Sequence, residues 1–495
     1  MPIMDEPTSL DPQIADSNSE KLVAANCYEG LVRIMADGTI GKGVATDWNI
    51  SDDGLTYTFK LRNNSHWAMF SGHKAVLGEN YEDTFDITVK AEDFKFGIER
   101  TLSEQTGSAD APLFSAVKSI STPDDFTIVF NLSYADDNFL YALTNPGAMP
   151  CDEEFFNLTN GKYGLDAKYL LCNGPFHVSK WTEKTSVKLA KNNEYNGESS
   201  VSPSSVTFYI NNDDSEVADK MNSVTYDVAF LSSSQFSSIE NKKDLNSVAV
   251  QNVTYSFIFN QNDNNYRNKN MRLAFCRSCD TSSLFDSQSD ISKADGIVPP
   301  SCKIGGEDYR NGNAAELLSY DETLAKKNFN DALLELGSSS VETTILCTEQ
   351  YEPFVKQMVQ KLQKTLGVKF VSTVKVVSES DLEAAVNDGN YSVAFYPFKA
   401  KSSFAGEIIE GFDQNNIFGY ESDVLSQKIR NIKNNSGSLE GERSAVAYAE
   451  NYLVSEAVIM PVFYENSYFV TSKKTSGIYF YSSADNVCFI NAKKS

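Results

Sequence analysis

The clearest hydrophobic alternation in the chain follows a polar turn near its start. Apolar side chains occupy every second position there: Leu55, Tyr57, Phe59 and Leu61. The positions between them are polar, and a β-strand turns successive side chains to opposite faces, so the pattern predicts a half-buried strand. The pairs Asp37-Gly38 and Asp53-Gly54 are typical of hairpin turns. Hairpins are therefore expected near the start of the chain.

Helical spacing of apolar residues predicts several helices. A helix whose cap is Ser19 or Asn18 is expected first. Its apolar positions are Leu22, Val23, Cys27 and Leu31. Further helices are predicted at 90–100, 321–337, 353–366 and 443–457. Asp321 is expected to cap the second of these and Gly337 to end it. Its inward residues are expected to be Leu324, Leu333 and Leu336.

Strands alternate with these helices over most of the chain. They are predicted at 206–210, 227–230, 255–260, 341–347, 368–371, 391–396 and 459–464. Alternation of strands and helices is typical of mixed α/β domains. At 495 residues the chain has the length of two or three such domains.

Composition narrows the function classes. The formal net charge is −24, and nucleic-acid binders need a basic surface, so a nucleic-acid partner is not expected. An acidic surface is also an ordinary solution to solubility, so the charge says little about a ligand. No stretch approaches the ~18 consecutive apolar residues of a membrane span. A soluble binding or catalytic protein remains.

The eight cysteines are few for a disulfide scaffold of this length. Cys151 and Cys172 flank one segment, and two alternatives are open for them: a disulfide, or buried free thiols. Cys276 and Cys279 share one face of a helical pattern, with only Cys302 nearby, so a zinc quartet would be incomplete. No metal and no cofactor is expected.

Several short motifs occur in order near the start of the chain. They are Glu6-Pro7-Thr8-Ser9-Leu10-Asp11-Pro12, Tyr28-Glu29-Gly30-Leu31, Asp37-Gly38, Ala45-Thr46-Asp47-Trp48, Asp53-Gly54-Leu55-Thr56-Tyr57-Thr58-Phe59 and Leu61-Arg62. In this order they resemble the family 5 extracellular solute-binding proteins of ABC importers, the oligopeptide, dipeptide and nickel-binding group. Several matches in sequence over about sixty residues are far more specific than one short motif.

Later motifs extend the resemblance to about residue 470. They are Lys90 to Arg100, Asp124 to Phe130, Cys172-Asn173-Gly174-Pro175-Phe176, Tyr255 to Asn260, Tyr391 to Ala394 and Ile459 to Tyr464. The resemblance implies an α/β, two-lobe periplasmic-binding-protein-like fold (type II, cluster C) with an extra subdomain in the first lobe. The expected lobe I core is 1–42 with 172–254 and 462–495. Residues 43–171 are expected to form the extra subdomain, and 255–461 lobe II.

The resemblance also implies a ligand held between two lobes that move about a hinge. The hinge residues are expected to be Asn260, Pro461 and Tyr464. Aromatic candidates for the pocket walls are Phe114, Tyr255, Tyr351, Phe395, Tyr396 and Phe398. Core packing is the alternative for each of these side chains.

The chain departs from the family pattern after the strand at 391–396. Peptide-binding members commonly carry "G-W-x-A-D" there, with an Asp that pairs the α-amine of the ligand. Ungapped alignment places Lys401 at the Asp position and Phe398 at the aromatic one. An ammonium repels an α-amine, which puts the usual peptide mode in doubt. Either Lys399 or Lys401 meets an anionic or N-blocked ligand, or both lysines lie in solvent and another carboxylate pairs the amine.

Catalytic motifs are missing from the sequence: no nucleophile elbow, Walker loop, HExxH or dinucleotide fingerprint occurs. We therefore predict no enzyme but an extracytoplasmic substrate-binding protein of an ABC transporter, which passes oligopeptides to permease subunits. The alternatives are a small anionic or metal-chelate solute in the same fold, or a ligand-sensing domain. A monomer is expected, attached to the membrane only through the lipid anchor of a cell-surface lipoprotein, or periplasmic, after removal of a signal peptide.

Overall fold

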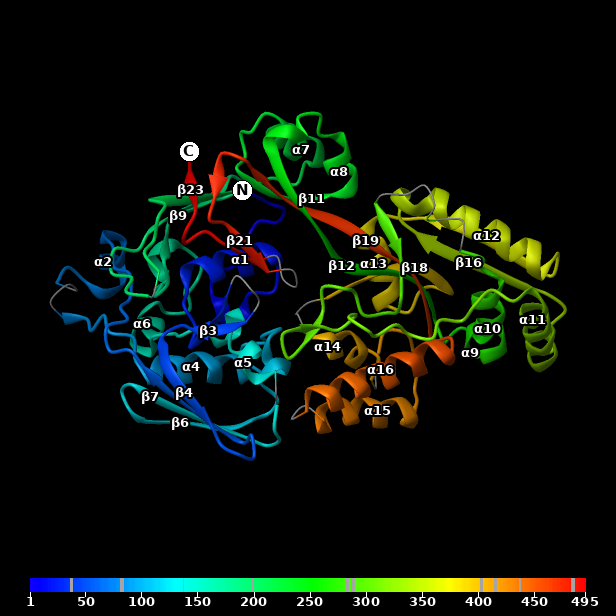
Figure 1. Ribbon diagram of the computed structural model, residues 1–495, viewed down its shortest axis with the longest axis horizontal. Coiled ribbons are helices and arrows are strands. Elements are labelled where there is room, and N and C mark those ends of the chain that lie inside the picture. Colours follow the sequence, from blue (N-terminus) through cyan, green and yellow to red (C-terminus); the bar gives the residue numbers. More distant parts are fainter. Residues whose placement is uncertain are drawn as a thin grey trace. The chain divides into compact units, whose positions relative to one another are not determined.

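The computed structural model of the chain consists of two units. Unit 1 comprises Met1–Ala249 and Tyr468–Ser495, and unit 2 comprises Val250–Ser467 (Figure 1). The structure describes all residues except 36–38, 81–83, 137, 198, 282–284, 286–289, 401–403, 414–415, 436–437 and 482–485. The expected turn at Asp37-Gly38 and the candidate Lys401 lie outside the described residues.

Unit 1 contains two four-stranded sheets and several short hairpins. The first sheet has the order β1 (Pro2–Ile3), β10 (Ser205–Ile210), β9 (Ser186–Lys191), β8 (Phe176–Thr182). The second has the order β4 (Ala45–Ile50), β5 (Thr56–Leu61), β7 (Thr127–Leu132), β6 (Val117–Asp124). The two-stranded pairs are β2 (Val32–Ile34) with β3 (Ile40–Lys42), β20 (Thr475–Ser476) with β23 (Lys493–Lys494), and β21 (Tyr479–Tyr481) with β22 (Asn486–Cys488).

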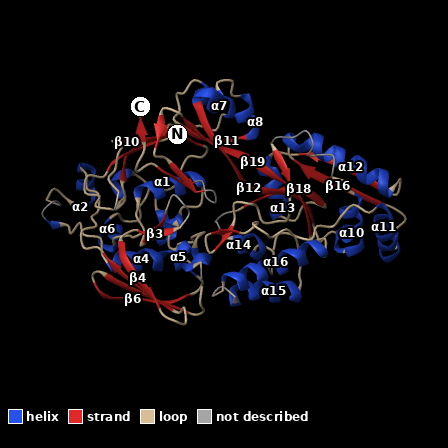
Figure 2. Cartoon of the chain, in the orientation of Figure 1, coloured by secondary structure: helices blue, strands red, loops and turns tan. Residues whose placement is uncertain are grey.

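Helices of unit 1 pack on these sheets, and Figure 2 shows α4 beside the sheet that contains β4 and β6. The α-helices are α1 (Asn18–Cys27), α2 (Lys74–Leu77), α4 (Ala91–Leu102), α5 (Phe139–Ala142), α6 (Glu153–Leu158), α7 (Asp214–Asn222) and α8 (Ser233–Ser238). The 3-10 helices are η1 (Pro12–Ile14), η2 (Ser71–His73), η3 (Ala111–Phe114), η4 (Pro146–Ala148), η5 (Ala167–Tyr169) and η6 (Lys242–Asp244).

The predicted strand at 55–61 shows how pattern becomes packing in unit 1. Tyr57, Phe59 and Leu61 of β5 are buried, while the residues between them are more exposed. The Phe59 ring meets Phe130 of β7 edge to face at 5.8 Å between centroids. On α4, Phe94 and Ile98 are fully buried. Period two on the strand and period four on the helix thus produce the core of this sheet.

Unit 2 is built from a mixed sheet and helices. Its strands are β13 (Ile291–Lys293), β14 (Lys303–Ile304), β15 (Glu307–Asp308), β16 (Val341–Cys347), β17 (Phe370–Val376) and β18 (Val393–Lys399). Its helices are α9 (Asn264–Arg267), α10 (Lys269–Ser278), α11 (Glu322–Leu336), η7 (Glu349–Tyr351), α12 (Glu352–Leu366), α13 (Glu379–Asn387), α14 (Ala405–Glu410), α15 (Asp423–Asn434) and α16 (Leu439–Ser455). The sheet order is β11 (Val228–Ser232), β19 (Ile459–Ser472), β12 (Leu245–Phe259), β18, β16, β17, and β11 belongs to unit 1.

Two long strands carry the chain from one unit to the other. β12 (Leu245–Phe259) runs from unit 1 into unit 2, and β19 (Ile459–Ser472) returns. The sequence predicted only the halves of these strands that lie in unit 2, at 255–260 and 459–464. Those halves of the strands are buried, so their residues form the apolar runs from which the strands were predicted.

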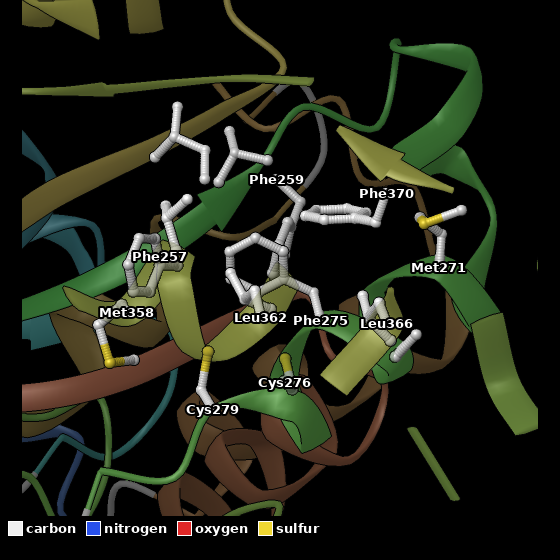
Figure 3. Close-up of a cluster of buried hydrophobic side chains, with 14 of the residues drawn as sticks. Phe257, Phe259, Met271, Phe275, Cys276, Cys279, Met358, Leu362, Leu366 and Phe370 are labelled. Carbon is white, nitrogen blue, oxygen red and sulfur yellow. The ribbon is translucent and has the colours of Figure 1, made fainter. Parts of the chain in front are cut away.

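The core of unit 2 lies on both faces of this sheet. Figure 3 shows one cluster, in which Phe257 and Phe259 of β12 face Phe275 of α10 and Phe370 of β17. Cys276 and Cys279 belong to the same cluster, and both are buried. A second cluster includes Ile258 of β12 and residues of α14, α15 and α16. A strand covered on both faces reads as a continuous apolar run, as β12 does at its end.

The predicted mixed α/β organisation is confirmed, and differences are local. The cap of α1 is Ser17, not Asn18 or Ser19, and it forms a capping box with Glu20. Leu324 is 40% exposed, because Ala325 and Phe329 take the inward positions of α11. The strand expected at 368–371 begins at Phe370, and Val368 is exposed in the turn before it. None of the described helices has both the length and the apolar character needed to cross a lipid bilayer.

Candidate functional site

Three of the aromatic candidates meet in one cluster of unit 2. Tyr255 lies 4.4 Å from Tyr351 and 5.4 Å from Phe395 between ring centroids. Phe463 of β19, which the sequence did not single out, stacks on Tyr255 at 5.1 Å. Phe395 is 1% exposed, so it belongs to the core, whereas Tyr255 is only partly buried. The four rings therefore form one aromatic cluster, with the partly buried Tyr255 at its margin.

Glu465 places a carboxylate beside this aromatic cluster. It follows Phe463 by two positions on β19, is half-buried, and accepts a hydrogen bond from the hydroxyl of Tyr351. Burial raises the pKa of this carboxyl above its usual range, and hydrogen bonds from Tyr351 and Gln350 offset part of that increase. In the described part of the chain no lysine or arginine forms an ion pair with Glu465. A half-buried carboxylate held by neutral donors keeps its charge available to a cation.

Lys399 lies on the same side of β18 as Phe395. The two residues share parity along the strand, and Lys399 pairs with Val253 of β12. The side chain of Lys399 is exposed, and its charge lowers the pKa of Glu465, although it is weaker than the other influences on that carboxyl. Charges of both signs therefore act on one another here, the ammonium of Lys399 and the carboxylate of Glu465.

Tyr396 and Phe398 lie on the opposite face of the sheet. Both pack against the second core cluster of unit 2, and the Phe398 ring stacks on Phe412 at 5.7 Å. Alternation along β18 thus separates Phe395 from Tyr396 and Phe398, since side chains at odd and even positions of a strand face opposite ways. Phe114 lies in unit 1, in η3, and is fully buried, which is the core packing that the sequence left open as its alternative.

Unit 1 contains a cavity of about 220 Å³ beside the motif Tyr28-Glu29-Gly30-Leu31. Its walls include Tyr28, Glu29, Val32, Tyr195 and Tyr479. The volume is below the roughly 300–1,000 Å³ of a complete pocket for a small molecule. The cavity can therefore hold one part of a ligand, such as a side chain, rather than the whole.

The strand β2 runs along this cavity, and β3 is its single partner strand among the described residues. Met35 N donates to Thr39 O and Gly43 N to Leu31 O. Backbone groups alternate in direction along an antiparallel pair, so those of Val32 point away from β3. Val32 is 1% exposed, so an added strand of extended peptide would reach these backbone groups only from the cavity beside them.

Glu29 is a wall of the cavity, but its charge is already paired. Arg62 donates to its carboxylate in an ion pair, and Tyr195 Oη donates to Glu29 Oε1 at 3.1 Å. Asn173 fixes the backbone of Glu29 from both sides, accepting from its N–H at 3.0 Å and donating to its carbonyl at 2.8 Å. Glu29 therefore holds the motif in place and is not a free partner for a cation.

The three hinge candidates all lie within unit 2. The chain passes between the units at Ala249–Val250 and Ser467–Tyr468, outside the expected crossings at 255–260 and 461–464. Tyr464 is buried, and its hydroxyl accepts a hydrogen bond from Asp295 N at 3.1 Å. Asn260 donates to the carbonyl oxygens of Gly389 and Tyr391. A hinge role for Asn260, Pro461 and Tyr464 stays a prediction.

The disulfide weighed for Cys151 and Cys172 is not present in this structure, which contains all eight cysteines, Cys27 among them, as free thiols. Cys151 Sγ accepts a hydrogen bond from Arg100 at 3.5 Å. The neighbour of Cys172 is Cys27, at the end of α1. Flanking one segment does not bring two cysteines together, because the chain between them folds as a separate set of short helices.

The sequence missed Glu465, Phe463 and the side of β2 that faces away from β3. Phe463 lies inside the motif Ile459 to Tyr464 and Glu465 follows this motif directly, so a search for another carboxylate near the motifs would have found Glu465. The edge of β2 has no signature in residue type, since backbone groups make it. Sequence motifs indicated the position of β2 in the chain but not which of its two sides pairs with β3.

Known proteins resemble this chain in sequence and in fold. The family model of bacterial extracellular solute-binding proteins, family 5, middle part, matches residues 39–418. The dipeptide-binding protein DppE of Bacillus subtilis (strain 168) is 24% identical over 496 residues, which cover 96% of this chain and 88% of the relative.

Solved structures share the fold over nearly the whole chain. OppA of Listeria monocytogenes bound to peptide has a TM-score of 0.77 at 21% identity and covers 100% of this chain and 98% of its own. AgaA of A. tumefaciens R10 in complex with agropinic acid has a TM-score of 0.74 at 18% identity and covers 99% and 97%. The two-lobe α/β fold expected from the motifs is thereby confirmed. The chain belongs to family 5 of the bacterial extracellular solute-binding proteins.

Proposed function

We propose that this protein binds peptides and delivers them to the membrane-spanning subunits of an ABC importer. The observation that carries the proposal is the backbone of Val32 in β2, which points away from β3 beside a cavity that fits one side chain. Main-chain hydrogen bonds to such an edge recognise any extended peptide, while the cavity receives a side chain. The names of DppE and of the Listeria OppA complex support the same ligand class.

Glu465 is the proposed partner of the peptide's α-ammonium. Family members commonly carry an Asp where this chain carries Lys401, and Glu465 would supply the missing carboxylate. The aromatic cluster of Tyr255 and Tyr351 lies next to Glu465. An ammonium paired to a half-buried carboxylate forms a charge-assisted hydrogen bond, which is stronger than a neutral one. The second interpretation from the sequence, in which another carboxylate pairs the amine, is therefore favoured.

An anionic solute is the second candidate ligand. The likeness to AgaA in complex with agropinic acid supports it, and so does the exposed Lys399. The carboxylates of Glu465 and Glu379, whose charges act on one another, oppose it. Metal-chelate binding and a sensory role stay alternatives from the sequence.

The proposed place of the protein is outside the cytoplasm, as for the family. We propose that it is a monomer held at the membrane by a lipid anchor after export, or free in a periplasm. In either position it would meet both its ligand and its permease.

The first experiment is native mass spectrometry of the protein after gentle purification, followed by calorimetry with the ligand class found. A ladder of peptide masses is the expected result. A single anionic small molecule would contradict the peptide proposal and support the anionic alternative.

The edge of β2 is then tested with Val32→Pro against Val32→Ala. Both changes remove the branched valine side chain, but only proline removes the N–H that faces away from β3. An unmet buried hydrogen bond costs about 1–3 kcal/mol, so the Kd of a peptide is expected to rise roughly tenfold or more in the proline variant alone. Equal Kd values for the two variants, with equal melting temperatures, would contradict strand addition at β2.

A further inference from the structure

Two cysteines that are far apart in sequence meet in the interior of unit 1. Cys27 ends α1, and Cys172 opens the run Cys172-Asn173-Gly174-Pro175. Their exposed fractions are 0% and 1%. Burial raises the pKa of the Cys27 thiol well above its usual range, and the Cys172 thiol raises it further through a hydrogen bond and through charge. The two free thiols therefore lie close enough to act on each other.

The backbone around both cysteines is held in place on each side. Gly174 N donates to Cys27 O at 2.9 Å, and a Cβ on Gly174 would lie 2.7 Å from that same carbonyl. Asn173 holds Glu29 through two hydrogen bonds, and Ala68 N donates to Cys172 O at 2.7 Å. The segments 27–29 and 172–174 thus run side by side at van der Waals distance, and only a glycine at 174 permits it.

The other described cysteines are placed differently. Cys151 Sγ accepts from Arg100, and Cys276 and Cys279 are three residues apart on α10 and its end. A bond between the latter two would close a very short loop and constrain the unfolded chain little. A bond from Cys27 to Cys172 would close a long loop, which is where a cross-link restricts the unfolded chain most.

We infer that Cys27 and Cys172 are a disulfide-forming pair, oxidised when the protein folds outside the cytoplasm. The oxidant is a disulfide, either a small molecule or an exchange protein. The thiolate of one cysteine attacks one sulfur of the oxidant, and a mixed disulfide and one thiol result. The second cysteine then attacks the protein sulfur, releases the second thiol, and the Cys27–Cys172 bond forms. Two electrons and two protons pass to the oxidant, which ends as two thiols.

Burial decides when this exchange takes place. The reactive species is the thiolate, and a thiol with a raised pKa inside the folded core reacts slowly. Oxidation is therefore expected during folding, while both cysteines are still accessible. Once formed, the bond ties Tyr28 and Glu29 to Pro175, and these residues are walls of the cavity beside β2.

The test compares protein exported to the periplasm of an expression host with protein made in its cytoplasm. Each sample is unfolded, alkylated with N-ethylmaleimide, and weighed whole. The cytoplasmic protein is expected to present all eight thiols, and the exported protein two fewer. Peptide mapping without reduction is expected to recover Cys27 linked to Cys172. The exported form is also expected to melt higher by roughly 5 °C or more, because the bond restricts its unfolded chain.

Cysteine variants supply the controls. Exported Cys151→Ala is expected to lose two thiols like the parent, whereas exported Cys27→Ala and Cys172→Ala are expected to lose none. Eight free thiols in the exported parent would overturn the inference. So would a linked peptide that joins any other pair, including Cys276 with Cys279. Neither result depends on the ligand, so the peptide proposal is tested separately.

Discussion

Glu29 in unit 1 and Glu465 in unit 2 are both carboxylates set into a wall of aromatic and apolar side chains. Arg62 forms an ion pair with the Glu29 carboxylate, Tyr195 donates a hydrogen bond to it, and Asn173 holds the Glu29 backbone. Glu465 receives hydrogen bonds from the neutral donors Tyr351 and Gln350 instead. One charge is thus compensated within the fold, and the other is not.

The two carboxylates are therefore expected to have different roles, one in folding and the other in ligand binding. A buried ion pair contributes little net stability, yet removing one partner is costly because the other charge is left without compensation. A half-buried carboxylate with neutral donors pays a desolvation penalty that an incoming cation relieves. Glu29 is therefore expected to matter for folding, and Glu465 for binding.

The largest effect is expected from Glu29→Ala. It leaves the Arg62 guanidinium, whose side chain is 11% exposed, without its partner. The free energy of unfolding should fall by about 3–5 kcal/mol in chemical denaturation. Glu322→Ala is the control, since the Lys326–Glu322 pair is about half exposed and its loss should lower the free energy of unfolding far less. Similar losses in the two variants would break the distinction made for Glu29.

A second effect concerns the pH dependence of unit 1. His73 is fully buried, its Nε2 lies 3.1 Å from Leu170 O, and burial lowers its pKa to about 4. The unfolded chain takes up a proton near pH 6.5, but the folded chain does not until about pH 4. Stability is therefore lost as pH falls from about 6.5 to about 4, by about 3 kcal/mol from this group.

His73→Gln checks that assignment, because the amide keeps a donor for Leu170 O but does not titrate in this range. Denaturation series from pH 7.5 to 4.5 should show a shallower decline for the variant than for the parent. Parallel declines would mean that other groups cause the acid sensitivity. The series also separates acid unfolding from any acid effect on binding.

Glu465→Gln is expected to act on binding and not on folding. Burial already disfavours the charged carboxyl, so the free energy of unfolding at pH 7 should stay constant or rise. A hydrogen bond to a charged group is worth about 1.5–3 kcal/mol, so the Kd of a free-amine peptide should rise roughly tenfold or more.

The matched ligand for this test is the same peptide with an acetylated N-terminus, whose Kd should be the same in parent and variant. Parent protein should also bind the free-amine peptide more weakly as pH falls through the raised pKa of Glu465, because protonation removes the charge. Equal loss of affinity for both peptides in Glu465→Gln would exclude pairing with the α-ammonium.

The smallest effect is expected from Lys399→Ala. The side chain is exposed, and its charge influences Glu465 only weakly, so the Kd of a peptide should change by about threefold or less. Lys375→Ala on the exposed edge strand β17 is the control. A loss of tenfold or more confined to Lys399→Ala, seen by calorimetry, would return this lysine to the binding site and favour an anionic ligand.

The sequence by itself determined the class of the protein and the local elements of its fold. Alternation of apolar residues placed β5, helical spacing placed α4, α11 and α12, and ordered motifs indicated the family. These features depend on residues close together in sequence, where side-chain period and turn chemistry decide the outcome. The pairing partners of Glu29 and Cys172 were not accessible in this way.

Only the tertiary structure decided which residues of one strand share a surface with residues of another. Phe395 and Phe398 are three positions apart, yet they face different core clusters because β18 is covered on both sides. Cys172 meets Cys27 and not Cys151, because close packing at Gly174 brings α1 beside the later segment. Such contacts depend on how distant segments pack, and no local pattern of residues encodes that register.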